Sequence, residues 1–209
     1  MGKYTAEAIE SLLQKSPFNV PCYTVSLGVN TILLSLLDYL DHEKADQIRD
    51  DHKEMTPELW KEVAKLVTGR VPAFQRDNDK WPRARQQQYV WNVLNGLRGA
   101  PLSLYNTVNE MTNANCLIHD GLQRATALGD FFYDPTFYFD TSIGKISRDD
   151  LLDVMPRRRI SSNIVIQVNI YRFQDHVEAC QHYIDINRGV THSDADIKRA
   201  EDYMAAHRK

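Results

Sequence analysis

The clearest hydrophobic pattern in the chain lies between residues 116 and 132. An apolar stretch from Cys116 to His119 is followed by Asp120 and Gly121, and apolar residues then recur at helical spacing. This order predicts a short buried strand, a tight turn and a helix that begins at once. We predict that Asp120 caps this helix, because its carboxylate can accept from free N–H groups. The expected core-facing residues of the helix are Leu122, Ala125, Leu128 and Phe132.

Similar patterns predict most of the elements after residue 70. Alternating apolar residues indicate a half-buried strand over residues 163–173. Further strands are expected over 102–108, 115–119 and 137–139, and helices over 82–97, 147–154, 174–186 and from Ser193 onward. This mixture of strands and helices predicts an α+β fold.

Residues 1–69 have a different character. Thr5 begins an amphipathic stretch that stops before Pro17, and residues 29–40 are apolar enough for a buried helix. Pro57 directly follows a threonine, as at the first position of a further helix. We therefore predict an all-helical N-terminal extension, residues 1–69, and a second domain, residues 70–209.

Composition narrows the class of protein. Hydrophobic residues make up 43% of the chain and charged residues 25%, which is ordinary for a globular protein. No run of 18 apolar residues occurs and the N-terminus lacks the pattern of a signal peptide, so we expect no membrane partner. Three widely spaced cysteines argue against disulfides and a cysteine zinc site. A cytoplasmic location follows as an expectation.

Charge is distributed unevenly within the net value of −3. Residues 1–69 carry 7 Lys/Arg against 11 Asp/Glu, whereas residues 70–209 carry 18 against 17. The densest basic run is Arg157, Arg158 and Arg159. This run is either a solvated linker or a contact for nucleic acid or phosphate, and both interpretations stay open.

The turn from Asp120 to Arg124 has the composition of an anion site. Gln123 and Arg124 fall in the first helical turn, beside free backbone N–H groups and the positive end of the helix dipole. A guanidinium can bind a phosphate through two parallel hydrogen bonds, and Gly121 lets the backbone approach a ligand closely. The simpler alternative is a capped helix with a surface arginine.

Two other stretches have the residue types to converge on the same ligand. The first is the Gln75-Arg76 loop with its neighbour Trp81, and the second is the polar helix end that carries Asp185 and Asn187. Arginine, a helix N-terminus and an Asp/Asn pair are suited to phosphates and a divalent cation. Alternatively, the Asp/Asn pair forms a C-terminal cap. Phosphate-loop, dinucleotide-fold, metalloprotease and serine-hydrolase motifs do not occur in the sequence.

These stretches together resemble a known family. The segments are 74–77 (FQRD), 120–128 (DGLQRATAL) and 183–189 (YIDINRG), followed by 196–200 (DIKRA). Their order is similar to that of the ParB-like domain with the D-G-Q-Q-R motif, found in GmrSD-type modification-dependent restriction enzymes and related phage-defence proteins. The resemblance implies a ParB/sulfiredoxin-like fold, a small mixed sheet flanked by helices.

The resemblance also implies a nucleotide site, in which the motif turn meets a nucleoside triphosphate with Mg²⁺ and hydrolysis licenses DNA cleavage. By position, Arg124 and Arg76 would bind phosphate oxygens, and Gln123 would orient a water. Asp120 would hold the metal or polarise that water. The turn would consist of Asp120, Gly121, Gln123 and Arg124. Gln75 and Arg76 would face the turn, and Asn187 would close it.

Departures from the family pattern leave alternatives open. Leu122 replaces the first glutamine of the motif, and Asp185 stands where the family has an arginine. The HNH-type nuclease domain of many members does not appear before Lys209. We therefore expect a nucleotide-binding module, with or without hydrolysis, acting on DNA or in restriction and phage–host conflict. The alternatives are a non-catalytic inhibitor or adaptor that engages a nuclease or host protein, and a stand-alone metal-dependent nuclease.

Overall fold

A computed structural model describes nine parts of the chain: residues 5–8, 11, 20–28, 70–75, 81–97, 99–109, 116–154, 165–187 and 194–207. The predictions for Arg76, for Arg157, Arg158 and Arg159, and for the helices between residues 29 and 69 lie outside these parts.

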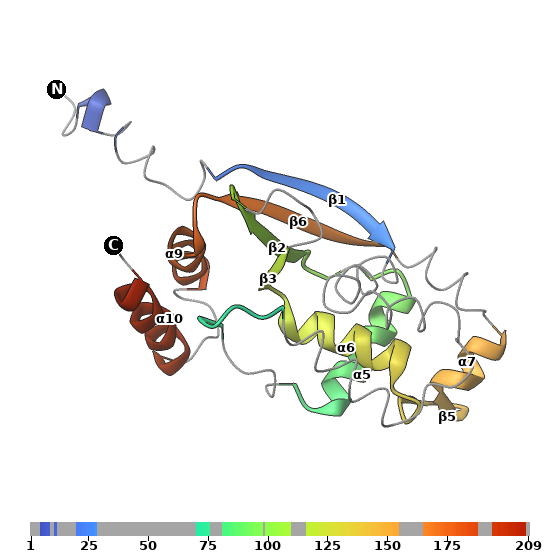
Figure 1. The fold of residues 1–209 in the computed structure, drawn as a ribbon. Helices are drawn as coiled ribbons and strands as arrows, with labels where there is room; N and C mark the ends of the chain where they lie inside the picture. The colour runs from blue at the N-terminus through green and yellow to red at the C-terminus, as the bar shows by residue number, and fades with distance from the viewer. Residues whose placement is uncertain are drawn as a thin grey trace.

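A mixed four-stranded sheet forms the centre of the fold (Figure 1). Its strands, in spatial order, are β1 (Cys22–Gly28), β6 (Val165–Phe173), β2 (Leu102–Thr107) and β3 (Leu117–Asp120). The pairs β1–β6 and β2–β3 are antiparallel, and β6–β2 is parallel. The predicted strands β2, β3 and β6 are therefore confirmed, and so is the expected α+β class with a small mixed sheet.

Five described helices and a hairpin surround the sheet. The helices are α5 (Arg83–Leu94), α6 (Leu122–Tyr133), α7 (Arg148–Val154), α9 (His176–Asn187) and α10 (Asp194–His207). The hairpin pairs the predicted strand β4 (Tyr138–Thr141) with β5 (Gly144–Ser147), which the sequence analysis did not predict. The helices predicted after residue 70 are thus confirmed as α5, α6, α7, α9 and α10. Among the described helices, none is long and apolar enough to cross a membrane.

The expected all-helical extension is wrong at strand β1. The start of the first predicted helix is present, since Ala8 N donates to the Thr5 hydroxyl at 3.2 Å. Further along, however, β1 pairs with β6 over its whole length. Val25 and Leu27 alternate with polar residues and pack against the hydrophobic core, and this two-residue period suits a strand at a sheet edge.

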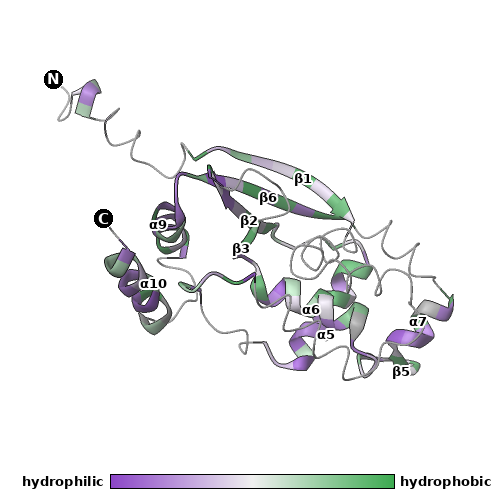
Figure 2. Ribbon diagram, viewed as in Figure 1, coloured by the Kyte–Doolittle hydropathy of each residue, from purple (hydrophilic) through white to green (hydrophobic). Residues whose placement is uncertain are grey.

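The sheet separates two hydrophobic cores, because successive side chains of a strand point to opposite faces. Leu104 and Val168 lie in the core shared with α5 and α6. Tyr105 and Phe173 lie in the core shared with α9 and α10. Hydrophilic and hydrophobic residues alternate along α5 and α6, as expected for helices with one face on the sheet (Figure 2). The result is three layers, with β3 at one edge.

The segment 70–75 runs along the free edge of β3. Ile118 N donates to the carbonyl of Arg70 at 3.0 Å. The side-chain amide of Gln75 donates to the carbonyl of His119 at 2.7 Å and also to that of Ile118. These bonds satisfy backbone groups that an edge strand would otherwise expose. They also fix the end of β3, where the chain turns into α6.

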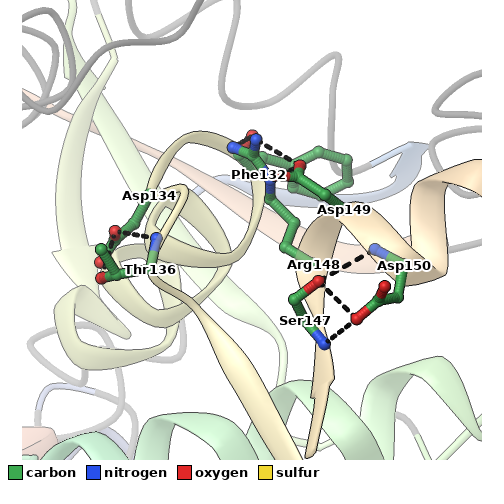
Figure 3. A network of polar contacts seen from close by, with 7 residues as sticks. All are labelled: Phe132, Asp134, Thr136, Ser147, Arg148, Asp149 and Asp150. Carbon is green, nitrogen blue, oxygen red and sulfur yellow. Dashed lines mark hydrogen bonds and ion pairs between the residues drawn. The ribbon is translucent and has the colours of Figure 1, made fainter.

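At the C-terminal end of α6, polar contacts connect the helix to α7 and to the following turn (Figure 3). Arg148 donates through Nη1 to the carbonyl of Phe132 at 3.3 Å and pairs with Asp149 at 2.6 Å. The Asp134 carboxylate accepts from the N–H and hydroxyl of Thr136 at 2.8 and 2.7 Å. The bond to Phe132 satisfies one of the carbonyl groups that a helix terminus leaves without an intrahelical partner.

The same end of α6 is joined to α5 by an arginine. Arg83 donates to Asp130 at 3.0 Å and to Asp134 at 2.7 Å. Both carboxylates are buried, while the arginine side chain keeps 41% of its surface exposed. Its guanidinium also lies over the Phe137 ring, 5.1 Å from the centroid. This group of contacts ties the two helices together.

Candidate functional site

A hollow of about 200 Å³ lies where β3 ends and α6 begins. All three stretches singled out in the sequence contribute to its lining, although they are far apart in the chain. The described lining residues are Gln75, Trp81, Arg85, Asp120, Gly121, Leu122, Gln123, Arg124, Tyr183 and Asn187. The expected convergence of these stretches is therefore confirmed for the described residues.

The helix begins one residue later than predicted. Gly121, with φ of +93°, is the N-cap of α6, and no side chain of the described residues caps the helix. Asp120 is the last residue of β3, and the prediction that it caps the helix is wrong. The left-handed glycine turns the chain between them, so the carboxylate instead accepts from Arg124 Nη2 at 2.9 Å. Within the described part of the chain, the first N–H groups of α6 thus have no intrahelical acceptor and no side-chain cap.

Gly121 is also the place where the turn is most crowded. A Cβ at this position would lie 2.6 Å from Leu102 Cδ2 and 2.8 Å from Arg124 Nη2. Both separations are far below an ordinary van der Waals contact. The absence of a side chain at Gly121 is therefore what lets the guanidinium of Arg124 fold back across the turn.

Two buried donors of the turn have no acceptor in the described part of the chain. Gln123 is 4% exposed, and its Oε1 accepts from Trp81 N at 3.0 Å, while its Nε2 has no partner there. Arg124 Nε is likewise buried without a partner among the described residues. Leaving a buried donor unpaired costs about 1–3 kcal/mol. A ligand that brings oxygen acceptors would remove this cost.

The charge of the lining favours an anion. Arg85 and Arg124 are its two cations, and Asp120 is the one carboxylate among the described lining residues. Arg124 is more enclosed than its partner, with 14% of its side chain exposed against 41% for Asp120. Arg85 is exposed and makes no ion pair with the described residues. The helix dipole adds further positive potential at this end of α6.

The amide side chains expected to face the ligand have structural partners. Gln75 uses its Nε2 to hold the end of β3, and its backbone carbonyl accepts from Arg199 at 3.1 Å. Asn187 donates through Nδ2 to the carbonyl of Tyr183 at 2.8 Å, one helical turn earlier in α9. Asp185 accepts from Gln181 at 2.9 Å and is not among the lining residues.

Two histidines form a buried pair behind the turn. His119 Nε2 lies 2.7 Å from His182 Nδ1, inside a group of aromatic rings. Burial, together with the neighbouring histidine, lowers the pKa of His119 from 6.5 to about 3. Burial also lowers the pKa of His182. Both rings are therefore neutral near pH 7, and one donates to the other.

The described residues do not fit a metal held by the protein. Among them, no group of three or more His, Cys, Asp or Glu is placed to hold an ion. Asp120, the expected metal ligand, is bound by Arg124 instead. Mg²⁺ normally needs one or two carboxylates besides phosphate and water.

Some lining residues were missed in the sequence. Arg85 was not a candidate, although it follows Trp81 by one helical turn, a spacing that brings side chains together. Tyr183 was included only as part of the segment 183–189, without a role of its own. The histidine pair left no local signal, since its members are 63 positions apart. The predicted contacts of Arg76 and of the Arg157–Arg159 run lie outside the described residues.

Comparison with known proteins gives no relative from which to transfer a function. The chain matches no protein-family model, and neither the search of curated proteins nor that of solved structures found a match.

Proposed function

We propose that the chain binds a nucleotide, whose phosphates lie at the N-terminus of α6. The observation that carries this proposal is the uncapped turn at Gly121, where Gln123 Nε2 and Arg124 Nε are buried donors without acceptors among the described residues. Free N–H groups, the helix dipole and a guanidinium favour the same kind of ligand, an anion rich in oxygen acceptors.

The sequence resemblance supports a nucleoside triphosphate as this ligand. On this proposal the chain has a ParB/sulfiredoxin-like fold and works as a ParB-like module on DNA, in restriction or in phage–host conflict. A nuclease or a host protein would then be its partner. Three of the four segments that carry the resemblance contribute to the hollow, and this arrangement supports the proposal.

A non-catalytic binding protein is the second candidate, and two contacts favour it. The carbonyl oxygen of Gln123 accepts from Trp81 N, and the carboxylate of Asp120 accepts from Arg124. One acceptor oxygen of each group is therefore occupied by a donor of the protein. Hydrolysis that used either of these two oxygens would require it to exchange its partner after the nucleotide binds, whereas simple binding would not.

The test is thermal unfolding with each of the four nucleoside triphosphates, with and without Mg²⁺. A ligand at 100 times its dissociation constant stabilises a protein by about 2.7 kcal/mol. We expect this stabilisation in the wild type and in Lys145→Ala, which removes an exposed cation on the β4–β5 hairpin. We expect none in Arg124→Ala. No shift with any nucleotide, or an equal shift in Arg124→Ala, would contradict the proposal.

Phosphate release then separates the two candidates. Turnover that is lost in Gln123→Ala would support the hydrolytic module. Stabilisation by a nucleotide without phosphate release, in the presence of Mg²⁺ and DNA, would support the non-catalytic binding protein.

A further inference from the structure

One wall of the hollow is formed by an aromatic ring with a guanidinium stacked on it. The guanidinium carbon of Arg85 lies over the Trp81 ring, 4.7 Å from its centroid, and both residues line the hollow. We infer that Trp81 and Arg85 hold the base of the nucleotide, so that the ligand is a nucleotide and not an inorganic polyphosphate. This inference rests on the proposed function. It adds protein contacts for the base, the part of the ligand that phosphate contacts cannot recognise.

The position of the Trp81 ring is fixed before any ligand arrives. Tyr89 packs edge-on against it, with 5.5 Å between ring centroids and an interplanar angle of 66°. The Trp81 backbone N–H is bound by Gln123 at 3.0 Å. A wall that is already ordered loses little entropy when a ligand stacks on it.

The chemistry of this wall suits a planar ring. Indole rings and guanidinium planes both stack on nucleobases, and an aromatic contact of this kind tolerates any base because every base has a flat face. Arg85 is exposed, and its cation makes no ion pair with the described residues. It can therefore stack on a base and still face the negative charge of the phosphates.

A single side chain connects this wall to the phosphate turn. Gln123 holds Trp81 through Oε1, and the same amide carries the buried Nε2 without an acceptor in the described part. Trp81 and Gln123 are 42 positions apart, so this bond fixes the relative position of two separate segments. A ligand with a base at one end and phosphates at the other would contact both.

Calorimetric titration can measure the two parts of the ligand separately. We would compare the four nucleoside triphosphates with inorganic triphosphate, using the wild type, Trp81→Leu, Trp81→Phe, Arg85→Gln and the Lys145→Ala control. The wild type should bind at least one nucleotide about tenfold more tightly than inorganic triphosphate, because stacking contributes to one ligand only. Trp81→Leu should abolish this preference, Arg85→Gln should reduce it, and Trp81→Phe and Lys145→Ala should keep it.

The affinity for inorganic triphosphate should stay the same in Trp81→Leu, which distinguishes base stacking from simple support of the turn.

Equal losses of affinity for nucleotide and inorganic triphosphate in Trp81→Leu and Trp81→Phe would overturn the inference. Binding of inorganic triphosphate as tight as that of every nucleotide would also overturn it and leave the phosphate site intact. Absence of binding by all ligands would reject the proposed function itself. Tighter binding of a short single-stranded oligonucleotide than of any mononucleotide would overturn the assignment to a free nucleotide.

Discussion

The two ends of helix α6 differ in how completely their polar groups are paired. At the C-terminal end, Arg83 binds two buried carboxylates and Arg148 binds the carbonyl of Phe132. At the N-terminal end, no side chain caps the helix and the described residues offer no acceptor to Gln123 Nε2. Both ends contain an Arg–Asp pair, and the pair at the N-terminal end, Arg124 and Asp120, lines the hollow.

This difference separates a structural ion pair from a candidate binding site. An arginine that bridges two helices has its hydrogen-bonding capacity committed to the fold, and removing it leaves buried charges unpaired. Arg124 pairs with a carboxylate four positions away on the same turn, an arrangement that contributes little to stability. The N-terminal end of α6 is therefore where a ligand can gain most from the polar groups of the protein.

The largest expected effect is that of Gly121→Ala. The new Cβ would meet Leu102 and the Arg124 guanidinium, and a non-glycine residue disfavours the left-handed backbone. We expect a loss of about 3 kcal/mol in the free energy of unfolding. The matched control is Gly96→Ala, at φ of +80° with no atom within 4 Å, which should cost only the backbone part. Equal urea midpoints for the two variants would show that crowding at the turn is unimportant.

The comparison of Arg83→Ala with Arg124→Ala tests the two ends directly. Arg83→Ala leaves Asp130 and Asp134 buried without their cation, so we expect a loss of about 2 kcal/mol, moderated by the exposure of the arginine. Arg124→Ala should change stability by only about 0.5 kcal/mol but abolish stabilisation by nucleotides. Urea unfolding with and without ligand measures both quantities. The reverse order of stability losses would break the comparison.

Acid should act on the two ends in opposite directions. The pKa of His119, just before the turn, is lowered to about 3 in the fold, so the unfolded chain binds the proton first and stability is lost as the pH falls below 6.5. Burial raises the pKa of Asp130 from 3.8 to about 6, so protonation below pH 6 favours the folded state. Each group contributes at most about 1.4 kcal/mol per pH unit.

Urea unfolding between about pH 7 and pH 4 would show these contributions. His119→Phe should flatten the loss of stability in acid, and Asp130→Asn should steepen it. Parallel profiles for the wild type and both variants would contradict the assignment.

The smallest expected effect is that of Asp120→Asn. Removing the carboxylate frees Arg124 from its internal partner, so inorganic triphosphate should bind about twofold more tightly, equivalent to about 0.5 kcal/mol. Calorimetry without divalent cations would measure this change. Weaker binding that appears only when Mg²⁺ is present would instead assign Asp120 to the metal, as the sequence resemblance implies.

The sequence was sufficient to predict α6 and its surroundings, because the helix buries one continuous stripe of side chains. Leu122, Ala125, Leu128 and Phe132 are all buried as expected. The N-cap was predicted at Asp120 and not at Gly121 because aspartate is one of the preferred N-cap residues. The left-handed backbone at Gly121 decides the question, and it occurs where Leu102 leaves no room for a Cβ, a contact between residues 19 positions apart.

Other features could not be predicted because they depend on contacts between distant parts of the chain. All seven residues of β1 are exposed or half-buried, so its short alternation is weak evidence for a strand until the edge of β6 is known. The partners of Gln75 and Gln123 are carbonyl and N–H groups of the backbone, which are the same in every sequence. Polar side chains of this kind look like ligand contacts in a sequence and become supports in the fold.

The position of β1 in the sheet also has a consequence for how the chain folds. Thr24 on β1 bonds to Asn169 on β6, which is 145 positions away. Contacts between such distant residues form slowly, because a long loop must close before any pairing energy is gained. Until β1 docks, β6 has an open edge that another chain could pair with. During synthesis, β1 leaves the ribosome early but cannot form its hydrogen bonds until β6, far along the chain, has also been made.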